Sequence, residues 1–174
     1  MSHLVPASPY VVVHPGASVP ARALTPTHAR RIVDELTRRG RTVVLTGSPD
    51  ERALCAAAAG PQSTDLSGAT GLPELAAVLA GAGCAVVGNT GPAHLSAAVG
   101  TPVVSLFSPV VPAWRWAPYG VDAVLLGDQW APCRGSRARD CPVPGHPCLS
   151  GVPVDDIADA VQFLTPQAVE AVPG

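Results

Sequence analysis

Short apolar runs rich in valine alternate with helix-forming stretches along most of this chain. The apolar runs cover residues 10–14, 42–46, 64–66, 84–87, 102–107 and 121–126, and the helix-forming stretches cover 26–39, 49–59, 73–82, 92–99 and 153–164. Strands that alternate with helices pair in parallel through right-handed crossovers, and strands that are apolar throughout are covered on both faces. The pattern therefore predicts an α/β fold, a Rossmann-like doubly wound parallel sheet, with a proline- and cysteine-rich loop over residues 128–151.

The length and charge of the chain limit what it can be. Its 174 residues are enough for one domain, spanning 1–174, and too few for two of ordinary size. Charged residues make up 14% and the net charge is -2, so no basic excess favours a nucleic-acid partner. No apolar run reaches the roughly 18 residues that span a bilayer, and the N-terminal segment lacks the basic and apolar regions of a signal peptide. We expect a soluble, cytoplasmic protein with no membrane span.

The most informative motif is Val87–His94, where a predicted strand ends, a glycine-containing turn follows and Pro92 opens a helix. Ligands of such sheets bind beyond the carboxyl ends of the strands. Free N–H groups at a helix start, together with the helix dipole, bind anions and suit a diphosphate. Thr90 and Gly91 would reach the phosphate oxygens, and His94 could add a donor. The alternative is that Thr90 only caps the helix and His94 is a surface residue.

A second motif follows the first predicted strand and reads His14-Pro15-Gly16-Ala17-Ser18, with Arg22 shortly after it. Gly16 would let the backbone approach a ligand closely, and Arg22 would supply a charge with the fork geometry that phosphate needs. Taken alone the motif is weak, because a loop arginine is usually a surface residue and a histidine at a strand end is usually buried and hydrogen-bonded. The Walker, GxGxxG, GxSxG and HExxH motifs are absent.

Four segments, in this order, carry a resemblance to a known family: HPGAS with Arg22, VVLTGSPDE, DLSGATGLPELAAVLAGAG and NTGPAHLSAAVGTPVVSLFSP. From about residue 10 to about residue 165 the chain resembles the C-terminal half of glycosyltransferase family 9, the ADP-heptose:lipopolysaccharide heptosyltransferases and their relatives. That family has the GT-B architecture, two Rossmann-like halves with a cleft between them. Its C-terminal half holds the nucleotide-sugar donor, and its N-terminal half supplies the acceptor site and the catalytic carboxylate base.

The resemblance also implies donor-binding residues by position. Eleven residues are expected to bind the donor: Gly16, Ala17, Ser18 and Arg22 at the diphosphate, Gly47 and, four residues past it, Glu51 at the nucleoside, Thr70 at the base, and Asn89, Thr90, Gly91 and His94 at the sugar and diphosphate. The family usually has an aspartate where this chain has Asn89, and asparagine keeps the hydrogen bonding but loses the charge. No metal or cofactor is expected, and the catalytic base would lie outside this chain.

The implied reaction is inverting transfer of a sugar from a nucleoside-diphosphate donor, ADP-heptose-like, to a hydroxyl of an acceptor glycan or glycolipid in lipopolysaccharide or cell-envelope biosynthesis. The helix start, Arg22 and Thr90 would stabilise charge on the departing diphosphate. Without the other half the chain would bind the donor but be inactive. The alternative is a non-catalytic nucleotide-sugar-binding module acting with a partner chain. A nucleotide-sugar epimerase is the least favoured function, and the residues leave the base, sugar and acceptor open.

The cysteines fall into two groups. Cys55 and Cys84 lie in apolar stretches and are expected in the core. Cys133, Cys141 and Cys148, together with His146, could bind zinc or form a disulfide, although their spacings are not of the CxxC type. Unliganded thiols in a loop are the interpretation we prefer.

Aromatic residues gather in one place, at Trp114, Trp116 and Tyr119. They are expected to pack over the edge of the sheet. The alternative is that they form a wall of the cleft next to the donor.

Overall fold

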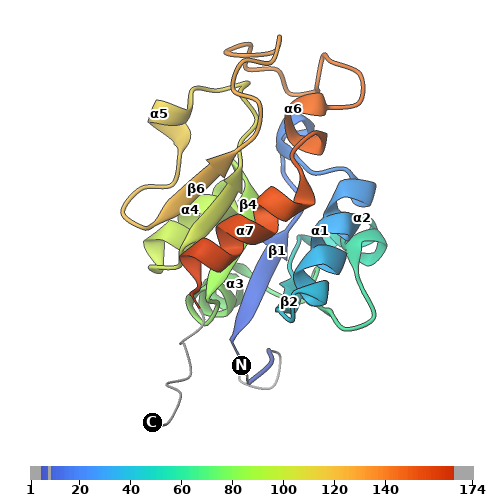
Figure 1. Ribbon diagram of the computed structural model, residues 1–174, viewed down its shortest axis with the longest axis vertical. Coiled ribbons are helices and arrows are strands. Elements are labelled where there is room, and N and C mark those ends of the chain that lie inside the picture. Colours follow the sequence, from blue (N-terminus) through green and yellow to red (C-terminus); the bar gives the residue numbers. More distant parts are fainter. Residues whose placement is uncertain (1–4, 8, 167–174) are drawn as a thin grey trace, which may run out of the picture.

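The computed structural model describes residues 5–7 and 9–166 and shows a sheet of parallel strands between two layers of helices (Figure 1). The strands are β1 (Tyr10–His14), β2 (Thr42–Leu45), β3 (Thr64–Asp65), β4 (Cys84–Gly88), β5 (Val103–Leu106) and β6 (Ala123–Leu126), in the order β3-β2-β1-β4-β5-β6. All neighbouring strands pair in parallel, which confirms the predicted Rossmann-like α/β fold. The strand order reverses between β1 and β4, the place where sheets of this kind bind ligands.

The helices follow the predicted pattern with ends shifted by a few residues. They are α1 (Pro26–Arg38), α2 (Arg52–Ala58), α3 (Leu72–Ala80), α4 (Gly91–Ala98), α5 (Ala113–Trp116), α6 (Pro147–Ser150) and α7 (Val154–Leu164), with the 3-10 turns η1 (Pro20–Arg22) and η2 (Pro49–Glu51). The predicted helix over 49–59 is divided into η2 and α2. The sequence pattern misses η1, α5 and α6, and α6 lies inside the predicted loop over 128–151. Elements of one turn are too short to show a helical period.

The core lies on both faces of the sheet because successive strand residues point to opposite sides. In β1, Val11 and Val13 pack with residues of α1 and α7, whereas Val12 packs with residues of α3 and α4. Cys55 and Cys84 are fully buried in this core, as expected. With both faces covered, the exposed part of the sheet that remains for a ligand is its carboxyl edge.

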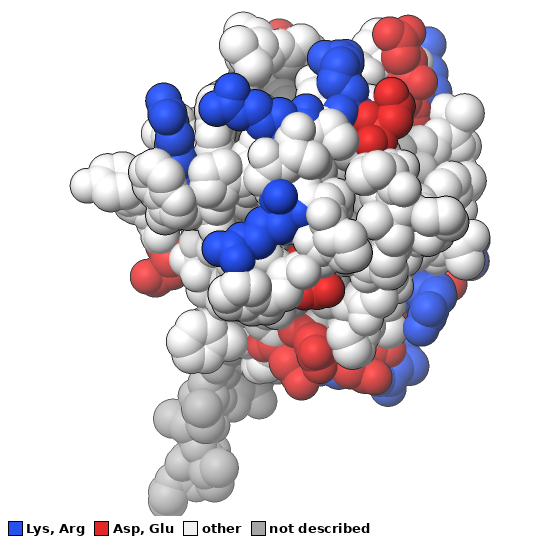
Figure 2. Space-filling model, turned by 90° about the horizontal axis from the view of Figure 1, so that it is seen from above, with Lys and Arg blue, Asp and Glu red and all other residues white. Residues whose placement is uncertain are grey.

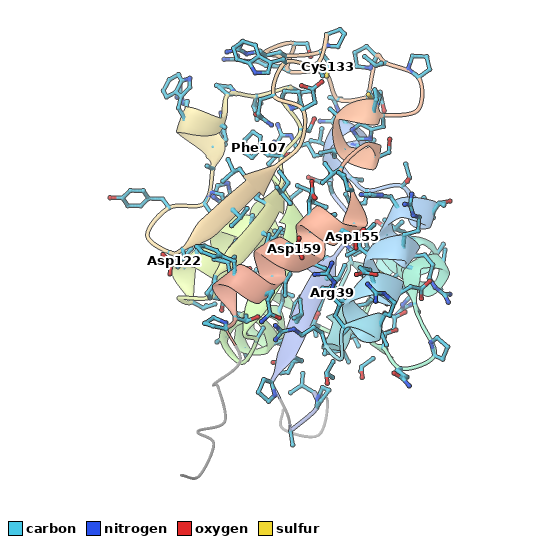
Figure 3. The ribbon with its side chains drawn as sticks, in the orientation of Figure 1. Arg39, Phe107, Asp122, Cys133, Asp155 and Asp159 are labelled. Atoms are coloured by element: carbon cyan, nitrogen blue, oxygen red, sulfur yellow. The ribbon has the colours of Figure 1, made fainter. Side chains whose placement is uncertain are left out.

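A network of charges joins α1 to α7 on the outer surface (Figure 3). Arg39 donates to Glu35 on its own helix at 2.6 Å and to Asp155 on α7 at 3.0 Å, and it also pairs with Asp159. Hydrogen bonds from Arg38 and Arg39 hold the pKa of Glu35 at about 2. Because these side chains are solvated, the network orients α7 against α1 more than it stabilises the fold.

The predictions about a membrane span, a signal peptide and the extent of the domain depend on different parts of the chain. Among the described residues, no helix combines the length and the apolar character needed to cross a membrane. The prediction that no signal peptide is present rests on the N-terminal segment, of which residues 1–4 and 8 lie outside the described residues. The predicted single domain likewise extends beyond residue 166, where the description stops.

Candidate functional site

A cleft of 690 Å³ lies beyond the carboxyl ends of β1, β2 and β4, at the point where the strand order reverses. The loop after β1, the turn η2 and the starts of α3 and α4 form its walls. Eight of the eleven predicted donor-binding residues line it, namely Gly16, Ala17, Ser18, Gly47, Glu51, Thr70, Thr90 and Gly91. The motifs after β1 and β4, which the sequence places far apart, therefore face one space because β1 and β4 are neighbours.

Several backbone N–H groups around the cleft are free to donate to an anion. Within the described part of the chain, the N–H groups of residues 16–18 make no hydrogen bond to another backbone group. The start of α4 offers fewer donors than expected, because Pro92 has no N–H and Ala93 N–H bonds the Thr90 carbonyl at 3.1 Å. Of these first N–H groups of α4, that of Gly91 has no backbone hydrogen-bond partner among the described residues. Thr90 is the N-cap residue of α4 but its side chain makes no capping hydrogen bond, and its contact with a ligand stays a prediction.

Asp50 and Glu51 both line the cleft, and a hydrogen bond fixes the carboxylate of Glu51. Glu51 Oε2 accepts a hydrogen bond from Ser48 N–H at 2.7 Å and lies 3.6 Å from His14 Nε2. Its other oxygen, Oε1, accepts no hydrogen bond from the residues that the structure describes. Gly16 packs directly on this carboxylate, and a Cβ there would lie 2.1 Å from Glu51 Cδ. The free Oε1 can therefore accept a hydrogen bond from a ligand hydroxyl.

His14 is a cleft residue that the sequence does not single out for binding. Its ring is buried, with Nδ1 2.9 Å from Thr46 Oγ1, which agrees with the expectation of a hydrogen-bonded buried histidine. The ring also lines the cleft beside Glu51. Burial lowers the pKa of His14, against the opposite effect of the Glu51 charge, so the ring is neutral at pH 7. Its position at the carboxyl end of β1 is the signal that points to the cleft.

Three predicted residues lie outside the walls of the cleft. Asn89 is buried, and its side chain makes two hydrogen bonds with the backbone of Ser108. Its Nδ2 donates to the Ser108 carbonyl at 3.1 Å, and its Oδ1 accepts from the Ser108 N–H at 3.1 Å. Arg22 is half-buried on η1, and among the described residues its Nε has no hydrogen-bond partner. His94 is exposed on α4. The contacts predicted for these three residues stay predictions.

The cysteine-rich loop carries free thiols (Figure 3, Cys133). Cys133 and Cys148 are buried and Cys141 is half-buried. Burial and the two neighbouring thiols raise the pKa of Cys148 to about 11. The His146 Nε2 lies within hydrogen-bond distance of the Ala21 carbonyl oxygen, at 3.0 Å. Across the part of the chain that is described, no three His, Cys, Asp or Glu side chains are placed to hold a metal ion.

The aromatic residues after β5 do not pack as expected. Trp114 is 86% exposed, Trp116 44% and Tyr119 93%, so the prediction that they cover the sheet edge is wrong. They do not line the cleft either. The reason is that α5 is a single turn that buries none of its own residues.

Two buried histidines predict a fold that weakens in mild acid. Burial lowers the pKa of His14, and burial together with Arg31 lowers that of His28, whose ring nitrogens have no hydrogen-bond partner among the described residues. The unfolded chain therefore binds protons that the folded chain does not. The free energy of unfolding falls as the pH drops through about 6.5 and levels off below the folded-state pKa, by at most about 1.4 kcal/mol per pH unit for each histidine.

Urea denaturation between about pH 8 and pH 5 measures this dependence. We expect His28→Leu to reduce the slope, because an apolar residue removes one of the two groups. His94→Gln, at an exposed position, is the control and should leave the slope unchanged. An equal slope in His28→Leu and the parent chain would contradict the assignment.

Comparison with known proteins identifies the family to which the chain belongs. Residues 2–144 match the family model described as Glycosyltransferase family 9 (heptosyltransferase), which is most of the chain. The chain belongs to glycosyltransferase family 9. This confirms the resemblance seen in the sequence motifs.

This family 9 chain is similar to curated heptosyltransferases. It is 32% identical over 171 residues to lipopolysaccharide heptosyltransferase 3 of Escherichia coli, covering 91% of this chain and 48% of that protein. It is 35% identical over 142 residues to lipopolysaccharide heptosyltransferase 1 of Pseudomonas aeruginosa, covering 78% and 38%. The chain therefore spans about half the length of these relatives or less.

Solved structures share the fold. The glycosyl transferase family 9 from Veillonella parvula aligns with a TM-score of 0.78 at 19% identity, over 96% of this chain and 49% of that chain. The E. coli heptosyltransferase WaaC with ADP aligns with a TM-score of 0.68 at 23% identity, over 91% and 45%. The Rossmann-like sheet of this family 9 chain thus matches about half of each neighbour.

Proposed function

We propose that this chain is the donor-binding half of a glycosyltransferase and binds a nucleoside-diphosphate sugar of the ADP-heptose type. The observation that carries the proposal is the cleft at the β1/β4 reversal, where free backbone N–H groups and one fixed carboxylate line the same space. Nucleotides need both features, since the diphosphate seeks donors and the ribose hydroxyls seek acceptors. Family membership and the heptosyltransferase relatives support the same donor class.

The lining residues divide between the parts of such a donor. The diphosphate oxygens accept hydrogen bonds from the N–H groups of residues 16–18 and from Gly91. A ribose hydroxyl donates to Glu51 Oε1, and the hydrogen bond from Ser48 N–H keeps that carboxylate in place. Thr70 and Leu72, at the start of α3, contact the base. Arg22, Asn89 and His94 have no part in this minimal arrangement.

The chemical contribution of this chain is to stabilise the leaving group. In an inverting transfer an acceptor hydroxyl oxygen bonds to the anomeric carbon while the bond from that carbon to the diphosphate oxygen breaks. Negative charge then grows on the diphosphate, and N–H groups that already point at it lower the barrier. The catalytic base comes from outside this chain. We therefore expect the isolated chain to bind the donor nucleotide without transferring the sugar.

Calorimetric titration with ADP, UDP, GDP and dTDP tests the proposal. We expect ADP to bind most tightly, and Glu51→Gln to weaken that binding about tenfold, because a hydrogen bond to a charged acceptor becomes a neutral one. Gly16→Ala should weaken it at least as much, since the new Cβ displaces the same carboxylate. Asp156→Asn, an exposed carboxylate on α7, is the control. The proposal fails if no nucleotide binds, or if both cleft variants bind like the parent chain.

A further inference from the structure

Arginines without carboxylate partners gather at the carboxyl edge of the sheet. Arg30, Arg38 and Arg39 on and just after α1 form ion pairs. In contrast, none of the arginines in the loops at the carboxyl edge pairs with a carboxylate of the described chain: Arg22, Arg115, Arg134, Arg137 and Arg139. Figure 2 looks down on this edge and shows several separate blue side chains over it. A chain with net charge -2 thus leaves cations unneutralised on the face that holds the cleft.

Two of these arginines line a second hollow, of 450 Å³, beyond the end of β5. We call it the arginine pocket, and the residues that matter in it are Pro109, Trp114, Gln129, Arg134 and Arg137. It shares no lining residue with the cleft. Its walls come from the loop after β5, from α5 and from the loop after β6.

The backbone that presents the two arginines is fixed. Gly135 N–H donates to the Pro109 carbonyl at 2.8 Å, and Arg137 N–H donates to the Val110 carbonyl at 2.8 Å. Arg137 is held in the left-handed region with φ of 56°, which is uncommon for a residue that is not glycine, asparagine or aspartate. Such backbone strain is found most often where a side chain must be presented to a ligand.

Aromatic rings stand beside these charges. The Arg134 guanidinium lies 4.4 Å from the centre of the Trp130 ring, a cation–π contact that orients it and leaves its N–H groups free of carboxylates. Trp114 lines the arginine pocket and is 86% exposed, so its ring has a face available to a ligand. An arginine fork for an anion and an indole face for a ring suit a ligand that is charged at one end and flat at the other.

The arginine pocket is adjacent to the cleft. The two hydrogen bonds between Asn89 and Ser108 join the carboxyl ends of the neighbouring strands β4 and β5. The next residue after Asn89 is Thr90, which lines the cleft, and the next after Ser108 is Pro109, which lines the arginine pocket. A ligand in the pocket therefore lies one strand away from a donor in the cleft.

We propose that the arginine pocket binds an anionic sugar residue of the acceptor, with its phosphate or carboxylate on Arg134 and Arg137 and its ring on Trp114. The proposal rests on the proposed function, because only a donor in the cleft makes the neighbouring sugar an acceptor. A sugar fits the observations better than a lipid surface does, since the charges lie in a hollow and on a fixed backbone. Phosphate and carboxylate share the recognition chemistry, and the test separates them.

NMR titration of the indole N–H signals of the three tryptophans tests the proposal. Glucose 6-phosphate, glucuronate, glucose and inorganic phosphate are added separately to the whole chain. We expect one of the two anionic sugars to shift the Trp114 and Trp130 signals and to bind about tenfold tighter than glucose or phosphate alone. The double variant Arg134→Gln with Arg137→Gln should weaken that binding at least tenfold, and Trp114→Ala should weaken it severalfold.

Controls separate this pocket from the cleft. Arg31→Gln removes an exposed, unpaired arginine on α1 and should leave sugar binding unchanged, and the double variant should keep the parent affinity for ADP. If the parent chain does not bind ADP, the proposed function is overturned. If the parent chain binds ADP but neither anionic sugar, only this inference is overturned. Equal binding of phosphate and glucose 6-phosphate overturns it too. Arginine-dependent binding to phosphatidylglycerol vesicles without sugar binding would assign the face to a membrane instead.

Discussion

Gly88→Ala is expected to lower the free energy of unfolding by about 3 kcal/mol. A Cβ at this position would lie 2.4 Å from the carbonyl oxygen of Arg22, a backbone atom of η1. That backbone cannot withdraw easily, because Ala21 N–H bonds the Arg139 carbonyl at 2.8 Å and Leu24 N–H bonds the Pro15 carbonyl at 2.9 Å. The contact must therefore be relieved by moving the end of β4 or the loop after β1, which together carry the cleft.

Chemical denaturation at pH 7 measures this effect, with Gly91→Ala as the matched control. A Cβ on Gly91 would meet nothing within 4 Å, so we expect a change of no more than about 0.5 kcal/mol. Similar destabilisation in both variants would show that the close approach at Gly88 is not the cause.

Asn89→Asp is expected to destabilise the fold by about 3 kcal/mol at neutral pH, although the two side chains have nearly the same shape. The Asn89 Nδ2 donates to the Ser108 carbonyl at 3.1 Å, and a carboxylate oxygen in its place would face that carbonyl with two acceptors and no proton. The site is buried, so water cannot restore the lost hydrogen bond. The bond from Ser108 N–H to the other oxygen can remain.

The dependence of this loss on pH identifies its cause. The folded state raises the pKa of the new carboxyl above the unfolded value of about 3.9, because only the protonated form can donate to Ser108. The destabilisation is therefore full above the folded-state pKa and decreases as the pH falls through that pKa toward the unfolded value. Denaturation at pH 7 and at lower pH measures it, with Gln62→Glu, an exposed amide, as the control. A loss that is absent, or independent of pH, would contradict the role given to the Asn89 amide.

The same pair of hydrogen bonds shows why the cleft could be predicted better than its individual contacts. The family usually has an aspartate at the position of Asn89, so the sequence suggested a polar group that reads the donor. In the structure this amide hydrogen-bonds the backbone of Ser108, a residue 19 positions away that follows the end of the neighbouring strand β5. Local turn chemistry showed where the strand ends, but only the packing of β4 beside β5 showed what the side chain contacts.

The fold itself followed from local patterns. Runs of valine in β1, β2, β4 and β5 predict strands covered on both faces, and the stretches between them predict crossover helices. Gly16, in the loop after β1, and Gly91, at the start of α4, were singled out from the sequence, and both line the cleft. The elements that the pattern missed, η1, α5 and α6, are single turns, which are too short to show a helical period.

The sequence by itself determined the alternation of strands and helices, the carboxyl edge as the expected binding edge, and eight of the sixteen residues that line the cleft. Only the tertiary structure decided that the His14 ring lies beside Glu51, that Trp114 is exposed rather than packed, and that Arg134 and Arg137 share a pocket. The physical reason is one of range. Strand and turn propensities act over a few neighbouring residues, whereas burial, hydrogen-bond pairing and pKa depend on which distant segments the sheet order brings together.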